Sequence, residues 1–554
     1  MAHRIALSLN NSLLLDVSCA LVVHKIYNKY EVEPANLLAT LILLVGIPSL
    51  PCYFLLAHFD SGVLAGLLSY AAFYGTLASS IILYRLSPIH PLAKYPGPWY
   101  LKISKLFAML HASSGKQYVF FRKLHDKYGS FVRVGPNEVS VADVEAIRPI
   151  LGLDGMRRGP LWIAHNKPGM TPSIAALRSV GLHDERRKLW NRGFTTAALK
   201  GLQIAVQDRV LELVDELNKR VSPRSEEKGA SLDLAHWLSS FAYDIMGDMV
   251  FGGGFSLMRK GDENGVRSVF NDYVKVVGVI EHISWIVGLV HKSATVPEKQ
   301  LRFQEFVVQR YEMRKNQGAT KRDLFHYITN EDKMEVPRDQ GINDVLVAIG
   351  AGADTTSTAL GGLFFYLLSN PSVFYRLRKE VDSEFPVGEG EPFDAVKLAS
   401  LPYLNAVINE TLRLQPAVPT SLQRCPLEGS GGKMVAVRFV PESTALYVPP
   451  YILHRDSRYF SPFPDSFIPE RWLDADGEKF TTNTAAFIPF STGPANCVGK
   501  NLALLEMRMA VATIVQRFDM KFASGYDPCK WEEDLQDFYI YRIGKLPIVL
   551  YARE

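Results

Sequence analysis

Cysteine is scarce in this chain of 554 residues, and its five copies are scattered along the sequence. No two of them form a CxxC pair, so the sequence has neither the usual spacing of a zinc site nor a disulfide framework. Such sparing use of cysteine is typical of a protein whose bulk lies in a reducing compartment. The five residues are Cys19, Cys52, Cys425, Cys497 and Cys529.

A large excess of charge is also absent. The 61 Lys and Arg residues and the 57 Asp and Glu residues leave a net charge of only +4. We therefore expect no broad basic face for nucleic acid. The sequence contains no internal repeat and no convincing glycine fingerprint for a dinucleotide. Hydrophobic residues, by contrast, make up 47% of the chain.

The longest apolar runs lie at the start of the chain. Residues 62–84 carry no charged side chain and are long enough to cross a bilayer as a helix. Residues 37–57 are also uncharged, although Pro48 and Pro51 would kink a helix there. The run 13–23 is shorter and contains Asp16. We expect a membrane anchor over residues 1–86 with two or three hydrophobic segments, of which 37–57 and 62–84 are the best spans. The alternative for 62–84 is a buried core helix.

The charges that flank the last apolar run predict the orientation of the anchor. Basic residues follow it, and the positive-inside rule then places the C-terminal part in the cytosol. Two spans would leave the N-terminus in the cytosol, whereas three would place it in the lumen. The sequon at Asn10 would report the difference, because only a luminal Asn10 can be glycosylated. The basic residues are Arg85, Lys94, Lys102 and Lys105.

Beyond the anchor the sequence changes character. Four prolines in residues 87–99 exclude a helix and predict a stiff, extended hinge. Helical periodicity dominates residues 100–554, as in 202–221 and 368–385. Residues 345–368 are apolar almost all round, which predicts a helix in the centre of the fold. Short strand patterns make the expected domain mostly α with a small β region; they lie at 131–134, 138–141, 435–440 and 446–448.

Cys497 differs from the other cysteines in its surroundings. It lies just before a strongly helical segment that starts at Lys500, where free N–H groups and the helix dipole lower a thiol pKa. Gly493 and Gly499 would let the backbone approach a flat ligand closely. A thiolate at such a place can ligate iron, and its electron donation favours O–O bond cleavage. The alternative is a small apolar core cysteine.

The pattern Phe490-x-x-Gly493-x-x-x-Cys497-x-Gly499 resembles the haem-binding signature of the cytochrome P-450 family. The segment 351–356, Ala-Gly-Ala-Asp-Thr-Thr, is similar to the family's central oxygen-activation helix. Small residues at 350–352 would leave room beside a haem, and Asp354 and Thr355 would relay protons. The alternative for this segment is tight helix packing with a Thr hydroxyl bonded to its own helix.

Other motifs of the family occur in the expected order. Glu410-Thr-Leu-Arg413 resembles the ExxR motif, whose charges share one helix face. Arg471, in Pro-Glu-Arg-Trp, resembles a third member of a buried structural network; the alternative is an exposed pair worth little. The sequence departs from the family at Ala495, where a cation usually pairs with a haem propionate. The resemblance instead implies His183, Arg187 and Arg424 as propionate partners.

The resemblance covers roughly residues 90–554 and implies the cytochrome P-450 fold, with haem b (iron protoporphyrin IX) between the central helix and the Cys497 loop. It implies a monooxygenase that inserts one oxygen atom from O2 into a lipophilic small molecule, by hydroxylation or epoxidation. Only 57 residues follow Cys497 (554 minus 497). We therefore expect electrons from a separate NADPH–cytochrome P-450 reductase, with Lys500 and Arg508 as candidates for docking it.

The anchor and the Pro-rich hinge are similar to those of eukaryotic microsomal members, and the repeated hydrophobic segments look most like fungal ones. This implies contact with membrane lipid, a catalytic domain on the cytosolic face of the endoplasmic reticulum, and a role in secondary metabolism or xenobiotic oxidation. The substrate class stays open among terpenoids, fatty acids, polycyclic aromatics and other natural products. Apolar segments expected to line the substrate pocket are 161–163, 345–349, 417–422 and 538–540.

Three other functions fit part of the sequence. A haem-thiolate enzyme that rearranges hydroperoxides would need neither O2 nor a reductase, but it would not need the Asp354–Thr355 pair either. A non-enzymatic transporter or receptor should have spans distributed along the chain, whereas the apolar runs stop near residue 84. A haem-binding module without turnover is the third, and Ala495 is the residue that favours it.

Overall fold

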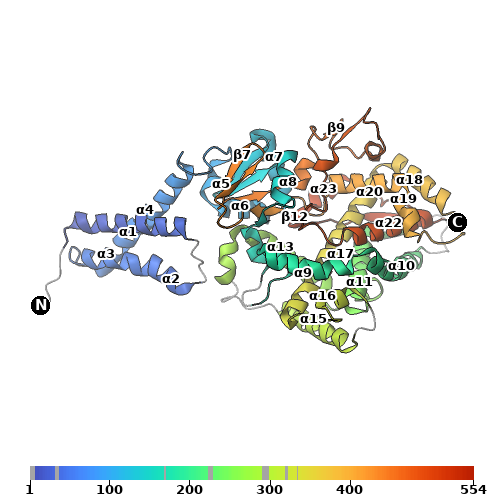
Figure 1. The fold of residues 1–554 in the computed structure, drawn as a ribbon, viewed down its shortest axis with the longest axis horizontal. Helices are drawn as coiled ribbons and strands as arrows, with labels where there is room; N and C mark the ends of the chain where they lie inside the picture. The colour runs from blue at the N-terminus through green and yellow to red at the C-terminus, as the bar shows by residue number, and fades with distance from the viewer. Residues whose placement is uncertain are drawn as a thin grey trace.

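The computed structural model describes residues 7–30, 36–166, 170–221, 229–289, 298–318, 322–333 and 335–553. A narrow helical bundle at the N-terminal end is joined to a much larger body of helices and small sheets (Figure 1). The chain enters this body beside a small sheet region and ends at the far side, among α18, α19 and α22.

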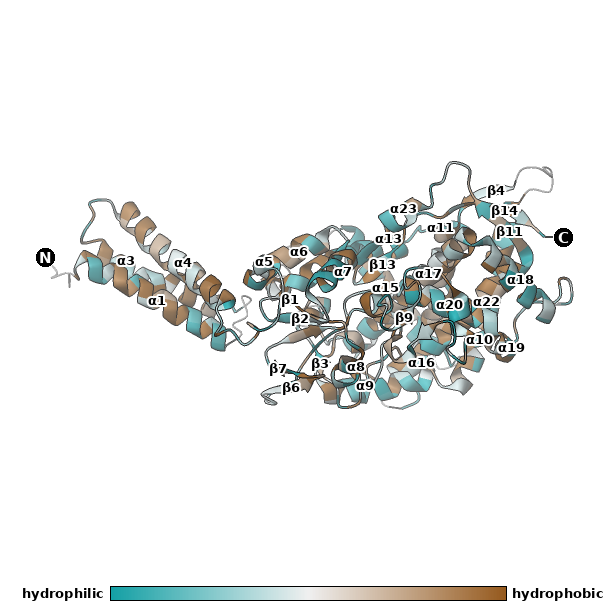
Figure 2. Ribbon diagram, turned by 90° about the horizontal axis from the view of Figure 1, so that it is seen from above, coloured by the Kyte–Doolittle hydropathy of each residue, from teal (hydrophilic) through white to brown (hydrophobic). Residues whose placement is uncertain are grey.

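The N-terminal bundle consists of α1 (Leu9–Lys29), a long bent helix formed by α2 (Leu37–Leu41), η1 (Ile42–Gly46) and α3 (Ile47–Leu55), and α4 (Gly62–Leu86). Within the described residues, two helices are long and apolar enough to cross a membrane: Leu37–Leu55 and Gly62–Leu86. Many residues of this bundle are hydrophobic, as the brown parts of its ribbon show (Figure 2). α1 packs along both of them, and the Ser69 hydroxyl of α4 donates a hydrogen bond to Asp16 at 2.8 Å.

Pro48 bends the second helix without leaving its backbone unsatisfied. A proline has no N–H, so the carbonyl oxygen of Leu44 loses its usual partner four residues later. The hydroxyl of Tyr74, on α4, donates to this oxygen at 2.6 Å. The hydroxyl of Tyr70 similarly donates to the carbonyl oxygen of Val45 at 3.1 Å. Side chains of α4 therefore donate hydrogen bonds to the carbonyl groups just before Pro48.

The segment between α4 and α5 forms turns and contains no helix. His90, Leu92 and Tyr95 are buried in it, and the Tyr95 hydroxyl donates to the carbonyl oxygen of Phe439 at 3.0 Å. The segment is therefore fixed by packing on the large domain, and it differs from the extended hinge that its prolines suggest.

The helices of the large domain differ widely in length. They are α5 (Trp99–Ile103), α6 (Lys105–Ser113), α7 (Gln117–Tyr128), α8 (Val144–Leu151), α9 (Val180–Gly193), α10 (Thr196–Asn218), α11 (Leu234–Phe251), α12 (Leu257–Lys260), α13 (Val266–Ile280), α15 (Glu298–Asn316), α16 (Leu324–Thr329), α17 (Arg338–Ser369), α18 (Pro371–Glu384), α19 (Ala395–Ser400), α20 (Pro402–Leu414), α21 (Pro450–Leu453), α22 (Lys500–Arg517) and α23 (Cys529–Asp534). Short 3-10 turns add η2 (Pro160–His165), η3 (Ile174–Ala176), η4 (Glu281–Ile286), η5 (Pro469–Trp472) and η6 (Thr484–Ala486).

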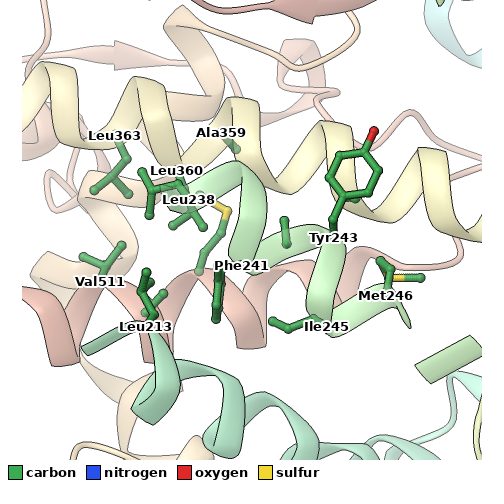
Figure 3. Close-up of a cluster of buried hydrophobic side chains, with 14 of the residues drawn as sticks. Leu213, Leu238, Phe241, Tyr243, Ile245, Met246, Ala359, Leu360, Leu363 and Val511 are labelled. Carbon is green, nitrogen blue, oxygen red and sulfur yellow. The ribbon is translucent and has the colours of Figure 1, made fainter. Parts of the chain in front are cut away.

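α17 is the central helix of the domain. Its 32 residues span about 48 Å, and most of the segment that is apolar all round is buried. α11 packs along it, while α10 and α22 close the other side of the same core. Figure 3 shows Leu213, Phe241, Leu360 and Val511 from these four helices converging in one cluster. The predicted buried helix is thus found, and it begins seven residues earlier than its apolar stretch, at Arg338 rather than 345.

The β structure is small. Strands β1 (Phe131–Gly135), β2 (Glu138–Val141), β8 (Ala445–Tyr447), β5 (Gln423–Cys425) and β3 (Arg157–Arg158) form one sheet in that order, with only β2 and β8 parallel. A second sheet has the order β11 (Phe518–Phe522), β14 (Pro547–Ala552), β4 (Ala230–Asp233). Two-stranded pairs join β6 (Gly432–Val435) to β7 (Arg438–Pro441), β9 (Phe460–Ser461) to β10 (Thr481–Thr482), and β12 (Gln536–Phe538) to β13 (Ile540–Arg542).

Two predicted elements are wrong in detail. The expected helix 368–385 is interrupted at Asn370, because Pro371 keeps the residue before it out of the helical region. The expected strand 435–440 is instead divided by a turn at residues 436 and 437, which joins β6 to β7 in a hairpin and holds Ala436 at φ 49°.

Candidate functional site

The loop before α22 holds Cys497 through backbone contacts. The Cys497 N–H donates to the carbonyl oxygen of Phe490 at 2.9 Å, and the Asn496 N–H donates to that of Gly493 at 3.1 Å. Gly493 has φ +75°, and a Cβ there would lie 1.9 Å from the carbonyl oxygen of Leu151, so only glycine fits. At Gly499 a Cβ would lie 3.9 Å from the Cys497 sulfur, an ordinary contact distance.

The thiol of Cys497 is accessible, but the protein around it disfavours a charge. Burial raises its pKa, and this outweighs the opposite effects of the Gly499 N–H, Arg187 and the Lys500 N–H. The N–H groups at the helix terminus do lower the thiol pKa, as the sequence predicts, but burial raises it by more. A metal ion bound to the sulfur would deprotonate it directly, so the site suits a coordinated thiolate better than a free one.

A cluster of basic side chains lies beside this loop. Arg158 of β3, His183 of α9 and Arg424 of β5 line one small cavity together with Ala495. Burial lowers the pKa of Arg158 to about 9, and the positive charge of Arg424 adds to this effect. Burial also lowers the pKa of Arg424, to about 10. Burial and Arg158 lower the pKa of His183 to about 4.

The arginines of this cluster have no carboxylate partner in the part of the chain that the structure describes. Among the described residues, Arg158, Arg187 and Arg424 form no ion pair, while His183 faces only the half-exposed Asp184 at 3.2 Å. The Nε of Arg158 and the Nε2 of His183 are buried and have no hydrogen-bond partner among the residues that the structure describes. Buried cations are costly unless they are paired. The residues present therefore fit a ligand that carries carboxylates of its own, as haem does.

Arg187 has a different position from the other cations. Its guanidinium donates to the carbonyl oxygen and the side-chain oxygen of Asn496 at 2.6 and 2.7 Å, and to Asn191 at 2.8 Å. It therefore braces the residue directly before Cys497. The sequence did not single out Arg158; the only signal for it was an adjacent pair of arginines, Arg157-Arg158, with no acidic residue beside it.

Asp354 and Thr355 occupy the middle of α17. The hydroxyl of Tyr243, on α11, donates to Asp354 Oδ1 at 2.7 Å. Burial raises the pKa of Asp354 to about 6. The Thr355 hydroxyl donates to the carbonyl oxygen of Ala351 at 2.6 Å, which is the local bond expected of a Thr inside a helix. Its oxygen lone pairs stay available as acceptors.

The small residues of α17 serve helix packing at two of three positions. A Cβ on Gly350 would lie 2.8 Å from the Phe270 ring, and one on Gly352 would lie 2.4 Å from the Met246 sulfur. These glycines admit side chains of α13 and α11, and Gly350 also lines the apolar cavity described below. Ala351 is the exception, because it is exposed on a helix that is otherwise largely buried.

Asp354 borders two cavities of different character. One, of roughly 220 Å³, is mainly apolar and is also lined by Gly350 and Ala351. The other, of roughly 670 Å³, is more open and polar, with His236, Arg267 and Arg542 in its wall. Because the first is the more enclosed and is lined by the exposed face of α17, it is the better candidate for an apolar ligand.

A buried ionic network lies behind the loop. Glu410 Oε1 is 2.8 Å from Arg413 Nη2 and 3.0 Å from Arg471 Nε, and all three side chains are fully buried. Trp472 Nε1 donates to the second carboxylate oxygen at 3.0 Å. Arg413 also donates to the carbonyl oxygen of His454 at 2.7 Å. The network ties α20 to η5 and to the segment that leads into the Cys497 loop.

Comparison with known proteins identifies the family of the large domain. A family model described as Cytochrome P450 matches residues 95–541. The chain belongs to the cytochrome P450 family. "Cytochrome P450 67" of Uromyces fabae is 34% identical over 488 residues, covering 84% of this chain and 87% of that protein. "Cytochrome P450 monooxygenase nodW" of Hypoxylon pulicicidum is 32% identical, with coverages of 87% and 86%. "Tryprostatin B 6-hydroxylase" of Aspergillus fumigatus is 30% identical, with coverages of 86% and 83%.

Membership confirms the predicted fold class and makes this P450 an oxidoreductase of a haem-binding family. The lining of the apolar cavity agrees with three of the four predicted segments, through Trp162, Leu346 and Phe538. Residues 417–422 do not line it; Thr420 and Ser421 are instead buried in hydrogen bonds. Sequence reasoning missed the aromatic side chains of α13 and α15, whose amphipathic pattern does not reveal which neighbour they face.

The two basic residues considered for docking differ in this P450. Lys500 is exposed, with its Nζ 5.8 Å from the centre of the Phe490 ring. Arg508 is half-buried, and its Nε donates to the side-chain oxygen of Asn405 at 2.8 Å. Lys500 is therefore free to contact a partner, whereas Arg508 already has a structural contact.

Proposed function

We propose that this P450 is a membrane-anchored haem-thiolate monooxygenase that inserts one oxygen atom from O2 into a lipophilic small molecule. The observation that carries the proposal is the joint arrangement of the Cys497 loop and a nearby group of buried and half-buried arginines that have no carboxylate partner among the described residues. Haem b supplies O2 activation at its iron when bound. Cys497 would ligate the iron, and Arg158, His183, Arg187 and Arg424 would hold the propionates in place of a cation at position 495.

The chain's own groups can manage protons beside this site. Because its pKa is raised to about 6, the Asp354 carboxyl can both take up and release a proton near neutral pH. Asp354 lines both the polar and the apolar cavity, and this position suits transfer of a proton from the polar cavity to the apolar one. Thr355 donates to Ala351, so the lone pairs of its oxygen can accept a further hydrogen bond.

The apolar lining of the smaller cavity supports a lipophilic substrate and the exclusion of bulk water. Relatives named as monooxygenases of fungi, including the tryprostatin B 6-hydroxylase, support hydroxylation of a fungal secondary metabolite or a xenobiotic. Electrons would come from NADPH through a separate cytochrome P-450 reductase, docked near Lys500. The two apolar helices support anchoring in the endoplasmic reticulum membrane, with the large domain in the cytosol.

The test is the carbon monoxide difference spectrum of the reduced protein. We expect a Soret band at the red-shifted position of a thiolate-ligated haem, and its loss in Cys497→Ser with the far-UV circular dichroism unchanged. Cys529→Ser, a change at an exposed cysteine outside the site, is the matched control and should keep the band. A band typical of histidine ligation in the folded wild type would refute the assignment. Retention of the red-shifted thiolate band in Cys497→Ser would also refute it. Consumption of NADPH with a reductase then separates a monooxygenase from a hydroperoxide isomerase.

A further inference from the structure

The apolar cavity beside α17 has a polar region formed by two consecutive residues. Most of its wall is aromatic or aliphatic, with rings from Phe270, Phe303 and Phe538. His165 and Asn166, at the end of η2, also line it. A few placed polar groups in an otherwise apolar pocket are what fixes the orientation of a bound small molecule.

The ring of His165 is held from behind. Its Nε2 lies 2.9 Å from Oε2 of Glu281, a residue of η4 that is only 1% exposed. The hydroxyl of Ser421 donates to the other oxygen of the same carboxylate at 3.4 Å. The rings of Trp162 and Tyr539 pack against the imidazole with centroids 5.3 and 5.0 Å away. Glu281 is thus a positioning residue, and the imidazole has one defined orientation.

This arrangement gives the imidazole a definite hydrogen-bonding character. A carboxylate only accepts hydrogen bonds, so the nitrogen that faces Glu281, Nε2, carries the proton. In the neutral form of the ring, Nδ1 is then left as an acceptor. In the neighbouring residue, Asn166 Oδ1 is buried and has no hydrogen-bond partner among the described residues. A buried acceptor without a donor is costly, and a ligand that brings a donor removes the cost.

We propose that His165 and Asn166 form an acceptor subsite that selects apolar substrates carrying an N–H or O–H donor. The subsite deepens the proposed function and rests on it, since it defines the substrate class of the same cavity. It fixes the donor end of the molecule beside η2, so that the apolar remainder extends along α17 past Gly350 and Ala351. The identity of the substrate then depends on a polar contact that an apolar cavity alone would not provide.

Three tricyclic molecules of matched shape test the subsite. Carbazole has an N–H donor, dibenzofuran has an acceptor oxygen at the same position, and fluorene has a methylene group with neither property. Binding to the full-length, haem-loaded protein in lipid nanodiscs is followed by quenching of each probe's own fluorescence, with empty nanodiscs as the reference for partition into lipid. We expect carbazole to bind about fivefold more tightly than fluorene, the effect of one good hydrogen bond. Dibenzofuran should bind no more tightly than fluorene.

His165→Phe keeps the aromatic packing and removes the Nδ1 acceptor. Asn166→Leu keeps the side-chain size and removes the Oδ1 acceptor. Each should reduce the carbazole preference, and the double variant should bring the affinity ratio close to one while fluorene binding stays constant. Asn343→Leu is the matched control, because Asn343 lines the same cavity but its amide nitrogen already donates to the carbonyl oxygen of Thr171 at 2.8 Å. This variant should keep the preference.

Equal binding of carbazole and fluorene by the wild type, a preference for dibenzofuran, or an unchanged ratio in the double variant would overturn the inference. The carbon monoxide spectrum of the same samples separates this failure from failure of the proposed function. A thiolate band with no carbazole preference would refute only the subsite proposal. A carbazole preference without a thiolate band supports the subsite and refutes the haem-thiolate assignment.

Discussion

Replacing Glu410 with Gln is expected to destabilise the large domain severely, although the side chain keeps its size and shape. The carboxylate receives hydrogen bonds from Arg413 at 2.8 Å and from Arg471 and Trp472 at 3.0 Å, all within a fully buried network. The amide would leave two buried guanidinium groups without a counter-charge and would turn an N–H₂ group toward their donors. Breaking such a pair by removing one partner costs about 3–5 kcal/mol.

The measurement is urea unfolding of the full-length protein, followed by far-UV circular dichroism. For a urea slope of roughly 3 kcal/mol per M or more, the predicted loss lowers the midpoint by on the order of 1 M. Glu298→Gln is the control, because its ion pair with Arg302 is 76% exposed on both sides and should contribute less than about 0.5 kcal/mol. If Glu410→Gln shifts the midpoint no more than this control does, the network does not contribute as the buried geometry requires.

A second variant tests the cause of the loss. If the cost in Glu410→Gln comes from uncompensated buried positive charge, then adding Arg471→Met removes part of that charge and should recover part of the stability. The double variant would then be less destabilised than the sum of the two single variants. Simple addition of the two effects would mean that lost packing, and not charge, is responsible.

The remaining predictions concern the site itself. Because Asp354 is protonated below its pKa of about 6 and ionised above it, the yield of product per NADPH should fall as the pH rises from 6 to about 8. Asp354→Asn should lower the yield and remove this pH dependence. An equal dependence on pH in both proteins would contradict the proton role of Asp354. Arg158→Ala should speed transfer of haem to an excess of apomyoglobin by roughly tenfold, the effect of one lost charge-assisted hydrogen bond. Arg157→Ala should not, because Arg157 pairs with the exposed Glu428 at 2.9 Å; equal rates in the two variants would remove Arg158 from the propionate site.

Local patterns in the sequence were enough to predict the elements that carry the site. The apolar run around residues 345–368 predicted the central helix α17, since a helix that is apolar all round must be buried. The spacing of Glu410 and Arg413 predicted a shared face, and the structure places both in one buried pair. The turn before α22 followed from Gly493, whose positive φ no other residue adopts easily.

What the sequence could not predict depends on neighbours that are distant along the chain. Gly350 and Gly352 have the same composition signal whether they face a cofactor or another helix, and only tertiary packing shows Phe270 and Met246 against them. The net pKa of Cys497 is a balance between burial and local N–H groups, and sequence reveals only the second. Arg158 joins the cluster of basic side chains because β3 pairs with β5, a register that strands of two and three residues do not encode.

Asp354 illustrates the same limit for chemistry. The motif around it identifies a carboxyl group on a buried helix, but its proton affinity depends on where the helix lies and on Tyr243, which is 111 residues away in sequence. That hydroxyl donates to the carboxylate and so lowers its pKa, while burial raises it by more, to about 6. Without burial the group would be ionised throughout the neutral range and would hold no proton to transfer. Without the tyrosine it would keep its proton to higher pH and release it less readily. The usable proton at Asp354 is thus a property of the packing of α11 against α17.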